Sequence, residues 1–200
     1  MLARLHALFL HKFSPRYNRL AQARKHQLFA HLSGPVLEVA AGSGANFDYF
    51  PPSIEWTGAD PNPFGARYCL PAAEARHIPA RWTTAPAERL PFPDHAFPTV
   101  IATLALCSIH DPAAALAEIR RVLQPGGTYL FLEHVAAPPD TPTRRRQRLL
   151  HPLFRCCFHC NPTLDTAALL RQAGFASLEL EHFHLPIPIV GPHIAGRAVR

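Results

Sequence analysis

The chain has 200 residues, of which 48% are hydrophobic and 17% charged, and its formal net charge is +6. This length and composition predict one globular domain with its own core and exclude a disordered chain. No apolar run reaches the ~18 residues of a membrane span and no secretory signal is evident, so we expect a cytoplasmic protein. Five cysteines, an odd number, indicate reduced thiols. The positive charge is spread out and specifies no partner.

Residues 1–33 are predicted to form a helical cap. Apolar side chains recur at helical spacing over residues 1–13, which is typical of an amphipathic helix. These side chains are Leu2, Leu5, Leu8 and Phe9. Ser14-Pro15 predicts a break, and a second helix is expected from about Arg16 to Leu32. We interpret the first helix as packed on the domain, with a lid or a membrane-surface contact as the alternatives.

The segment from Val36 to Asn46 predicts a strand, a glycine turn and the start of a helix. Its apolar first part is typical of a buried parallel strand. Gly42 and Gly44 allow a sharp turn and a close approach to a ligand. This is the geometry of a nucleotide-type site at the carboxyl edge of an α/β sheet. Phe47 replaces the third glycine of the dinucleotide fingerprint, which argues against a pyrophosphate cradle.

A second strand, expected over residues 54–59, ends at Asp60. A carboxylate there can accept two hydrogen bonds from a ribose diol. The alternative is that Asp60 only opens the turn that continues through Pro61 and Asn62. Next to the glycine turn we favour the ribose contact.

The remaining elements alternate between strands and helices. Strands are predicted near residues 81–85, 97–109 (a strand with the loop at its carboxyl end), 129–134, 175–185 and 194–199. Helices are predicted over residues 65–80 and 112–123, the latter with Asp111 as its N-cap, and again from Arg144 and from Asp165.

Two segments carry side chains that bind ligands in other contexts. The run Arg144–Arg148 predicts a solvated helix face, with anionic lipid or an acidic substrate as the alternative. Nucleic acid is not expected, because neither a reading helix nor interleaved aromatic residues accompany the charge. Cys156–Cys160 lacks a second spaced pair of ligands. We therefore predict buried thiols lining the cap, and no metal.

Over nearly the whole chain, this order of motifs resembles the class I S-adenosylmethionine methyltransferases. The resemblance implies a Rossmann-like α/β fold with a seven-stranded sheet, mostly parallel with the last strand antiparallel, and helices on both faces. It implies one domain over residues 1–200, with a core over 34–200 and an insertion around 140–162. In that family the acidic residue of the first strand steadies the glycine loop beneath the cofactor, and a loop like 87–92 meets adenine. The residues implied to bind the cofactor are Glu38, Ala40, Gly42, Gly44, Asn46, Asp60, Pro61, Asn62, Ala87, Glu88, Thr103 and Leu104.

A narrower resemblance concerns five segments. Residues 13–18, 60–63, 103–108, 133–136 and 192–199 are similar to those of alkyl-thiol S-methyltransferases. This implies transfer of a methyl group from S-adenosylmethionine to a small, lipophilic thiol, with S-adenosylhomocysteine as the product. The alternatives are an O- or N-methyltransferase acting on a quinone, phospholipid or secondary metabolite, a nucleotide-binding oxidoreductase, and a non-catalytic binding protein.

Two histidines are candidates for taking the proton from the thiol or stabilising the thiolate. His134 follows the fifth predicted strand and His110 follows the fourth, and these strand ends should face the reacting methyl group. A structural role is the alternative for both. We expect a monomer whose membrane contact, if it has one, is weak and uses residues 1–13 and 144–148.

Overall fold

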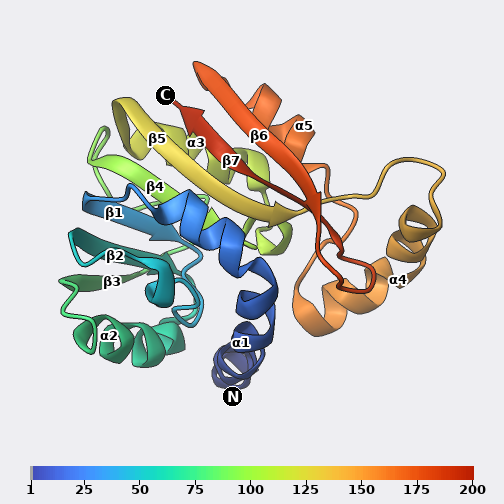
Figure 1. Cartoon of the computed structure of the whole chain (residues 1–200), viewed down its shortest axis with the longest axis horizontal. Helices are drawn as coiled ribbons and strands as arrows, with labels where there is room; N and C mark the ends of the chain where they lie inside the picture. Colours follow the sequence, from blue (N-terminus) through green and yellow to red (C-terminus); the bar gives the residue numbers. More distant parts are fainter. Residues whose placement is uncertain (1) are drawn as a thin grey trace.

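The computed structural model describes residues 2–200, except for the side chains of Leu2, His6 and Phe13. Seven strands form one sheet in the order β3-β2-β1-β4-β5-β7-β6 (Figure 1). Strand β7 is antiparallel to both of its neighbours, and the other pairs are parallel. This confirms the predicted fold class. The strands are β1 Gly34–Val39, β2 Ile54–Asp60, β3 Ala80–Thr84, β4 Phe97–Thr103, β5 Leu123–His134, β6 Ser177–His184 and β7 Pro192–Val199.

Helices cover both faces of the sheet. The α-helices are α1 Leu2–Phe29, α2 Ala66–Glu74, α3 Pro112–Val122, α4 Pro142–Phe158 and α5 Thr166–Gln172, and the 3-10 helices are η1 Phe47–Tyr49, η2 Pro63–Gly65 and η3 Leu106–Ser108. Successive strand residues point to opposite faces, so Val36 packs with α1 and α2 while Leu37 packs with α3 and α5. The central strands are therefore mostly apolar, as is typical of buried parallel strands, and Glu38 in β1 is a buried exception.

The predicted helix break at Ser14-Pro15 is wrong. Helix α1 is continuous from Leu2 to Phe29 with Pro15 inside it. Proline removes one backbone donor, and the Ser14 hydroxyl donates to the carbonyl of Leu10 in the turn affected. The ribbon bends between its two halves instead of ending (Figure 1). The cap is thus one long helix that crosses the carboxyl edge of the sheet.

Two helix starts follow their sequence signals. Asp111 accepts a hydrogen bond from the Ala114 N–H at the start of α3, and Asp165 accepts one from Ala168 at the start of α5. Strand β5 begins at Leu123, earlier than predicted, because it continues through the Pro-Gly-Gly segment. A register shift against β4 absorbs that irregular stretch.

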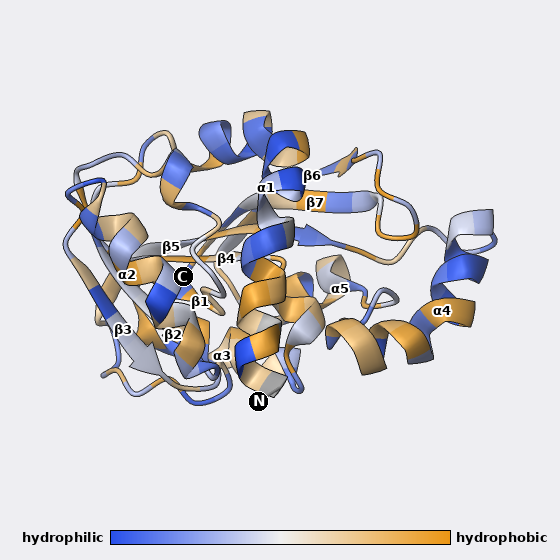
Figure 2. Ribbon diagram, turned by 90° about the horizontal axis from the view of Figure 1, so that it is seen from below, coloured by the Kyte–Doolittle hydropathy of each residue, from blue (hydrophilic) through white to orange (hydrophobic). Residues whose placement is uncertain are grey.

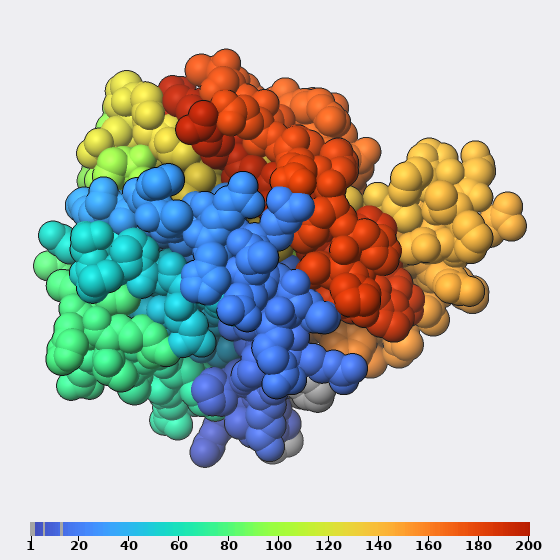
Figure 3. All heavy atoms as spheres, viewed as in Figure 1, coloured from blue at the N-terminus to red at the C-terminus, as the bar shows by residue number. Residues whose placement is uncertain are grey.

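Helix α4 stands out from one side of the molecule (Figure 3). The expectation of buried thiols at its end is wrong for Cys156 and Cys157, which are exposed. Cys160 is partly buried and turns toward the core. Among the described residues, no helix combines the length and the apolar character that crossing a membrane requires.

Candidate functional site

The glycine turn after β1 is held by the carboxylate at the end of β2. Its backbone has positive φ at Ala40 (53°), Gly42 (58°) and Gly44 (78°). The Gly42 N–H donates to Asp60 Oδ2 at 2.9 Å, and the Asn62 N–H donates to Asp60 Oδ1 at 2.8 Å. Asp60 therefore joins the two loops at the strand ends.

Glu38 supports the same turn from below. Its Oε1 accepts a hydrogen bond from Asn46 Nδ2 at 2.6 Å, and its Oε2 accepts one from Trp56 Nε1 at 2.7 Å. Burial raises the pKa of Glu38 to about 7, against the opposing effects of these hydrogen bonds and of Lys25. Glu38 thus holds Asn46 of the loop, and its role in cofactor binding stays a prediction.

A lysine that the sequence analysis missed ties α1 to this turn. Lys25 is 1% exposed, and its Nζ donates to Asn46 Oδ1 at 2.6 Å and to Asn18 Oδ1 at 2.7 Å. Asn18 in turn donates to the carbonyl of Ala45 at 2.7 Å. Burial lowers the pKa of Lys25 to about 8. The available signal in the sequence was a pair of polar residues, Asn18 and Lys25, seven positions apart on one face of the helix.

A cavity of about 240 Å³ lies between α1, the glycine turn and the end of β4. Its lining includes a buried phenol, Tyr17 Oη, that has no hydrogen-bond partner among the described residues. A Cβ at Gly42 would point into space bounded by Leu10, 3.6 Å away. An unsatisfied hydroxyl and a bare backbone turn fit the amino-acid end of S-adenosylmethionine. The lining residues are Leu10, Ser14, Tyr17, Asn18, Lys25, Glu38, Ala40, Ala41, Gly42, Ser43, Ala45, Thr103 and Leu104.

The predicted cofactor-binding residues lie in different parts of the structure. Glu38, Ala40, Gly42, Thr103 and Leu104 line the 240 Å³ cavity. Gly44 and Asn46 shape the loop behind it. Pro61 and Asn62 line a second cavity of about 750 Å³, together with Ala3, Leu5, Phe9, Cys156, Cys157 and His159. This second cavity lies between α1 and the end of α4, next to the end of β2.

The predicted adenine loop has a different contact in this structure. Glu88 Oε1 accepts hydrogen bonds from the N–H groups of His110 and Asp111, both at 3.2 Å. Ala87 is buried. Glu88 therefore holds the loop that follows η3, and its contact with adenine stays a prediction.

The two candidate histidines occupy different environments. His110 is exposed in the loop after η3. His134 is 4% exposed at the end of β5, and its Nε2 lies 3.1 Å from Cys160 Sγ. Cys107, in η3 just after β4, completes this group, and the hydrogen bond from Cys160 together with burial raises the pKa of Cys107 well above its usual value. The sequence analysis assigned no role to Cys107 and expected Cys160 only as a thiol lining the cap.

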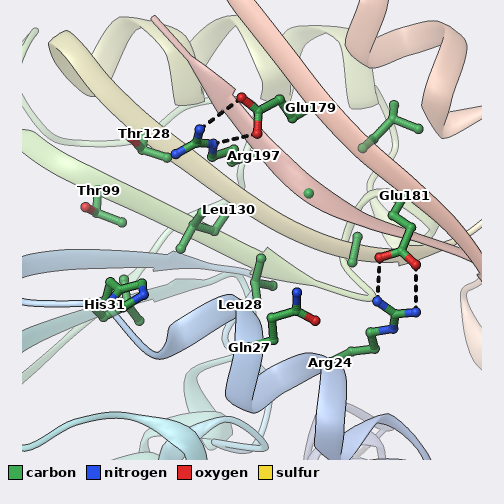
Figure 4. Close-up of a pocket in the computed structure, with 14 residues that line it drawn as sticks. Arg24, Gln27, Leu28, His31, Thr99, Thr128, Leu130, Glu179, Glu181 and Arg197 are labelled. Atoms are coloured by element: carbon green, nitrogen blue, oxygen red, sulfur yellow. Dashed lines mark hydrogen bonds and ion pairs between the residues drawn. The ribbon is translucent and has the colours of Figure 1, made fainter.

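A third cavity, of about 550 Å³, lies away from the glycine turn. Its lining includes Thr99, near the amino-terminal end of β4, and the paired Thr128 in the middle of β5. Ion pairs of Arg24 with Glu181 and of Arg197 with Glu179 border it (Figure 4). Ligands of open α/β sheets bind at the carboxyl ends of the strands, so this cavity is not the donor site.

Comparisons with known proteins also indicate a methyltransferase. The methyltransferase domain family model matches residues 37–131, from β1 into β5. The human thiol S-methyltransferase TMT1A is 37% identical over 96% of this chain and 84% of its own length, and human TMT1B is 35% identical over 94% and 82%. A SAM-dependent methyltransferase structure from Methanosarcina mazei superposes with a TM-score of 0.63 at 17% identity, covering 83% of this chain and 92% of that one. The chain therefore belongs to the family of S-adenosylmethionine-dependent methyltransferases that includes TMT1A and TMT1B.

Proposed function

We propose that the protein transfers a methyl group from S-adenosylmethionine to the sulfur of a small, lipophilic thiol, giving a thioether and S-adenosylhomocysteine. The similarity to TMT1A, at 37% identity over 96% of the chain, carries this proposal. The mostly apolar 750 Å³ cavity between α1 and α4 supports a lipophilic acceptor.

The cofactor supplies a sulfonium, which is a good leaving group, so the protein has mainly to align the reactants and exclude water. The backbone at Gly42 and Gly44 would receive the amino-acid part of the cofactor, and Asp60 would receive the ribose hydroxyls. Helix α1 closes the cavity from above through Tyr17 and Leu10.

The acceptor needs to lose a proton. A free alkyl thiol of the cysteine type has a pKa of about 8.5, so part of it is ionised near neutral pH without help. We assign His134 to the stabilisation of the thiolate, because it is buried at the end of β5 beside the carboxyl end of β4. No contact in this structure supports the same role for the exposed His110.

The test compares sulfur with oxygen in otherwise identical acceptors. Purified protein is incubated with S-adenosylmethionine and matched pairs, such as an alkyl thiol and the corresponding alcohol, and the products are identified by mass spectrometry. We expect the thioether and no ether. Methylation of the alcohol alone would replace this proposal by O-methyl transfer, and cofactor binding without transfer to any acceptor would favour a binding protein.

We further propose a cytoplasmic monomer with a weak membrane-surface contact through residues 1–13 and 144–148. Arg145, Arg146 and Arg148 are exposed on α4, which supports this contact. Light scattering coupled to size-exclusion chromatography tests the monomer, and a mass of twice 22.1 kDa would contradict it.

A further inference from the structure

Three side chains of the kind that bind transition metals meet at the carboxyl end of β4 and β5. They are Cys107 in η3, His134 at the end of β5 and Cys160 just after α4, and their ligand atoms all lie within 4.8 Å of one another. His134 and Cys160 are separated by 26 residues of sequence. The fold, and no local motif, brings them together.

The spacing suits a tetrahedral ion. Zinc binds cysteine sulfur at about 2.3 Å and histidine nitrogen at about 2.0–2.1 Å, so ligand atoms around it lie about 3.4–3.8 Å apart. His134 Nε2 and Cys160 Sγ are 3.1 Å apart, and no pair exceeds 4.8 Å. Small side-chain rotations would bring all three atoms to bonding distance.

Buried thiols usually act as small apolar groups, but this does not account for the histidine between them. His134 is 4% exposed, and its Nδ1 has no hydrogen-bond partner among the described residues. Its Nε2 meets the sulfur of Cys160, and sulfur is a weak hydrogen-bond acceptor. A buried ring whose Nε2 meets sulfur points to a ligand, and a metal ion bound by Nε2 would give this nitrogen a stronger partner.

We propose that Cys107, His134 and Cys160 form a zinc site with three protein ligands and a fourth position for the sulfur of the substrate. One nitrogen and two sulfurs are a ligand set typical of zinc, and three protein ligands with one open position are typical of catalytic sites. Cys107 Sγ lies 3.7 Å from the carbonyl of Leu104, which lines the 240 Å³ cavity. Leu104 therefore lies between the proposed zinc site and the cavity that we assign to the donor.

The catalytic role of this site, though not the binding of metal, rests on the proposed thiol transfer. The substrate thiol binds the ion as a thiolate and releases its proton to solvent. A lone pair of the bound sulfur forms the new bond to the methyl carbon. The bond from that carbon to the donor sulfonium breaks, and its electron pair returns to the donor sulfur, giving S-adenosylhomocysteine. The neutral thioether is a poorer ligand than the thiolate and leaves.

The experiment measures metal binding apart from turnover. Reduced protein is loaded with Zn²⁺ or Co²⁺ and dialysed, the metal content is determined by elemental mass spectrometry, and the Co²⁺ form is examined by absorption spectroscopy. We expect one equivalent of metal, thiolate-to-cobalt charge transfer, and a spectral change when an alkyl thiol is added. Cys107→Ser and Cys160→Ser should lose the metal and keep their affinity for S-adenosylhomocysteine, which shows that they fold.

The matched control is the double variant Cys156→Ser/Cys157→Ser, since these neighbouring cysteines are exposed. It should retain one equivalent of metal. Wild-type protein that binds no metal, or a control variant that loses it, would overturn the zinc site. An unchanged cobalt spectrum on addition of thiol would overturn the open fourth position. If metal-free protein methylates thiols, zinc has no catalytic role, but the proposed function stands. If metal-loaded protein methylates no thiol, the proposed function is wrong, but the zinc site stands.

Discussion

At the scale of single residues, Asp60 holds the glycine turn in place and is also predicted to bind the ribose of the donor. Its carboxylate already accepts N–H groups from Gly42 and Asn62. We expect Asp60→Asn to weaken binding of S-adenosylhomocysteine about ten- to a hundred-fold, because hydrogen bonds to a charged group contribute about 1.5–3 kcal/mol. Isothermal titration calorimetry measures this. The control is Asp48→Asn, which removes an exposed carboxylate paired with Arg76, and equal affinity in both variants would contradict the ribose contact.

His193 should make the stability of the fold depend on pH. It is 1% exposed, its Nδ1 lies 2.8 Å from the carbonyl of Gly191, and burial lowers its pKa to about 4. The unfolded chain therefore takes up this proton near pH 6.5, before the folded chain does. The stability due to neutral His193 is complete above about pH 6.5 and is lost as the pH falls toward 4, by about 3 kcal/mol in total.

The measurement is urea denaturation of wild type and His193→Asn between pH 4 and 7. Buried Glu133, whose pKa burial raises to about 7, acts in the opposite direction in both proteins, so the difference between them isolates the histidine. We expect the wild type to lose more stability than the variant on acidification. Parallel curves would show that His193 does not titrate as described.

At the scale of elements, the buried lysine joins the cap to the glycine turn. Lys25→Met removes the cation near Glu38 and the hydrogen bonds to Asn18 and Asn46. Breaking a buried charged network by removing one partner costs about 3–5 kcal/mol, and affinity for S-adenosylhomocysteine should fall as the loop loosens. Urea denaturation and calorimetry measure both effects. Arg19→Met, an exposed position on the same helix, should change neither, and equal behaviour of the two variants would contradict the network.

Alanine substitutions at two glycines distinguish the cost of backbone strain from the cost of a steric clash. Gly34 (φ +66°) and Gly44 (φ +78°) both have left-handed conformations, so alanine costs about 1–2 kcal/mol at either. A Cβ at Gly44 would lie 3.0 Å from the ring of Phe47, whereas nothing lies within 4 Å at Gly34. We expect Gly44→Ala to lose more stability and also cofactor affinity, and Gly34→Ala to lose stability only. Thermal melts with and without S-adenosylhomocysteine test this, and identical ligand-induced shifts would contradict it.

Local signals predicted the strands and the loop geometry well. Apolar runs bounded by glycine, proline and aspartate mark β1, β2 and β4, and the capping residues mark α3 and α5. The break at Pro15 was mispredicted because helix α1 continues through this proline with a bend (Figure 1). The group of Cys107, His134 and Cys160 depends on contacts between three distant segments, so no pattern in the sequence could indicate it.

At the scale of the whole molecule, the proposed active site lies between the sheet and the helices α1 and α4. The sheet supplies the donor loops, and the helices α1 and α4 supply the walls of the 750 Å³ cavity. Phe9 of α1 and Phe158 of α4 have ring centroids 5.8 Å apart, so the two helices meet there. Hydrophobic residues gather on the end of α4 that lies toward α1 (Figure 2).

The exposed face of α4 that carries Arg145, Arg148, Leu149 and Leu153, which we call the rim, should bind anionic membranes. Leu149 is 78% and Leu153 51% exposed on α4, beside the exposed Arg145 and Arg148. We expect the protein to co-sediment with vesicles containing phosphatidylserine more than with phosphatidylcholine vesicles, and less at high salt. Arg145→Gln/Arg148→Gln should weaken this binding about ten-fold or more, at about 1 kcal/mol per arginine. Leu70→Ser, which alters an exposed leucine on α2, should have no effect, and equal sedimentation with both vesicle types would show that the rim has no electrostatic affinity for membranes.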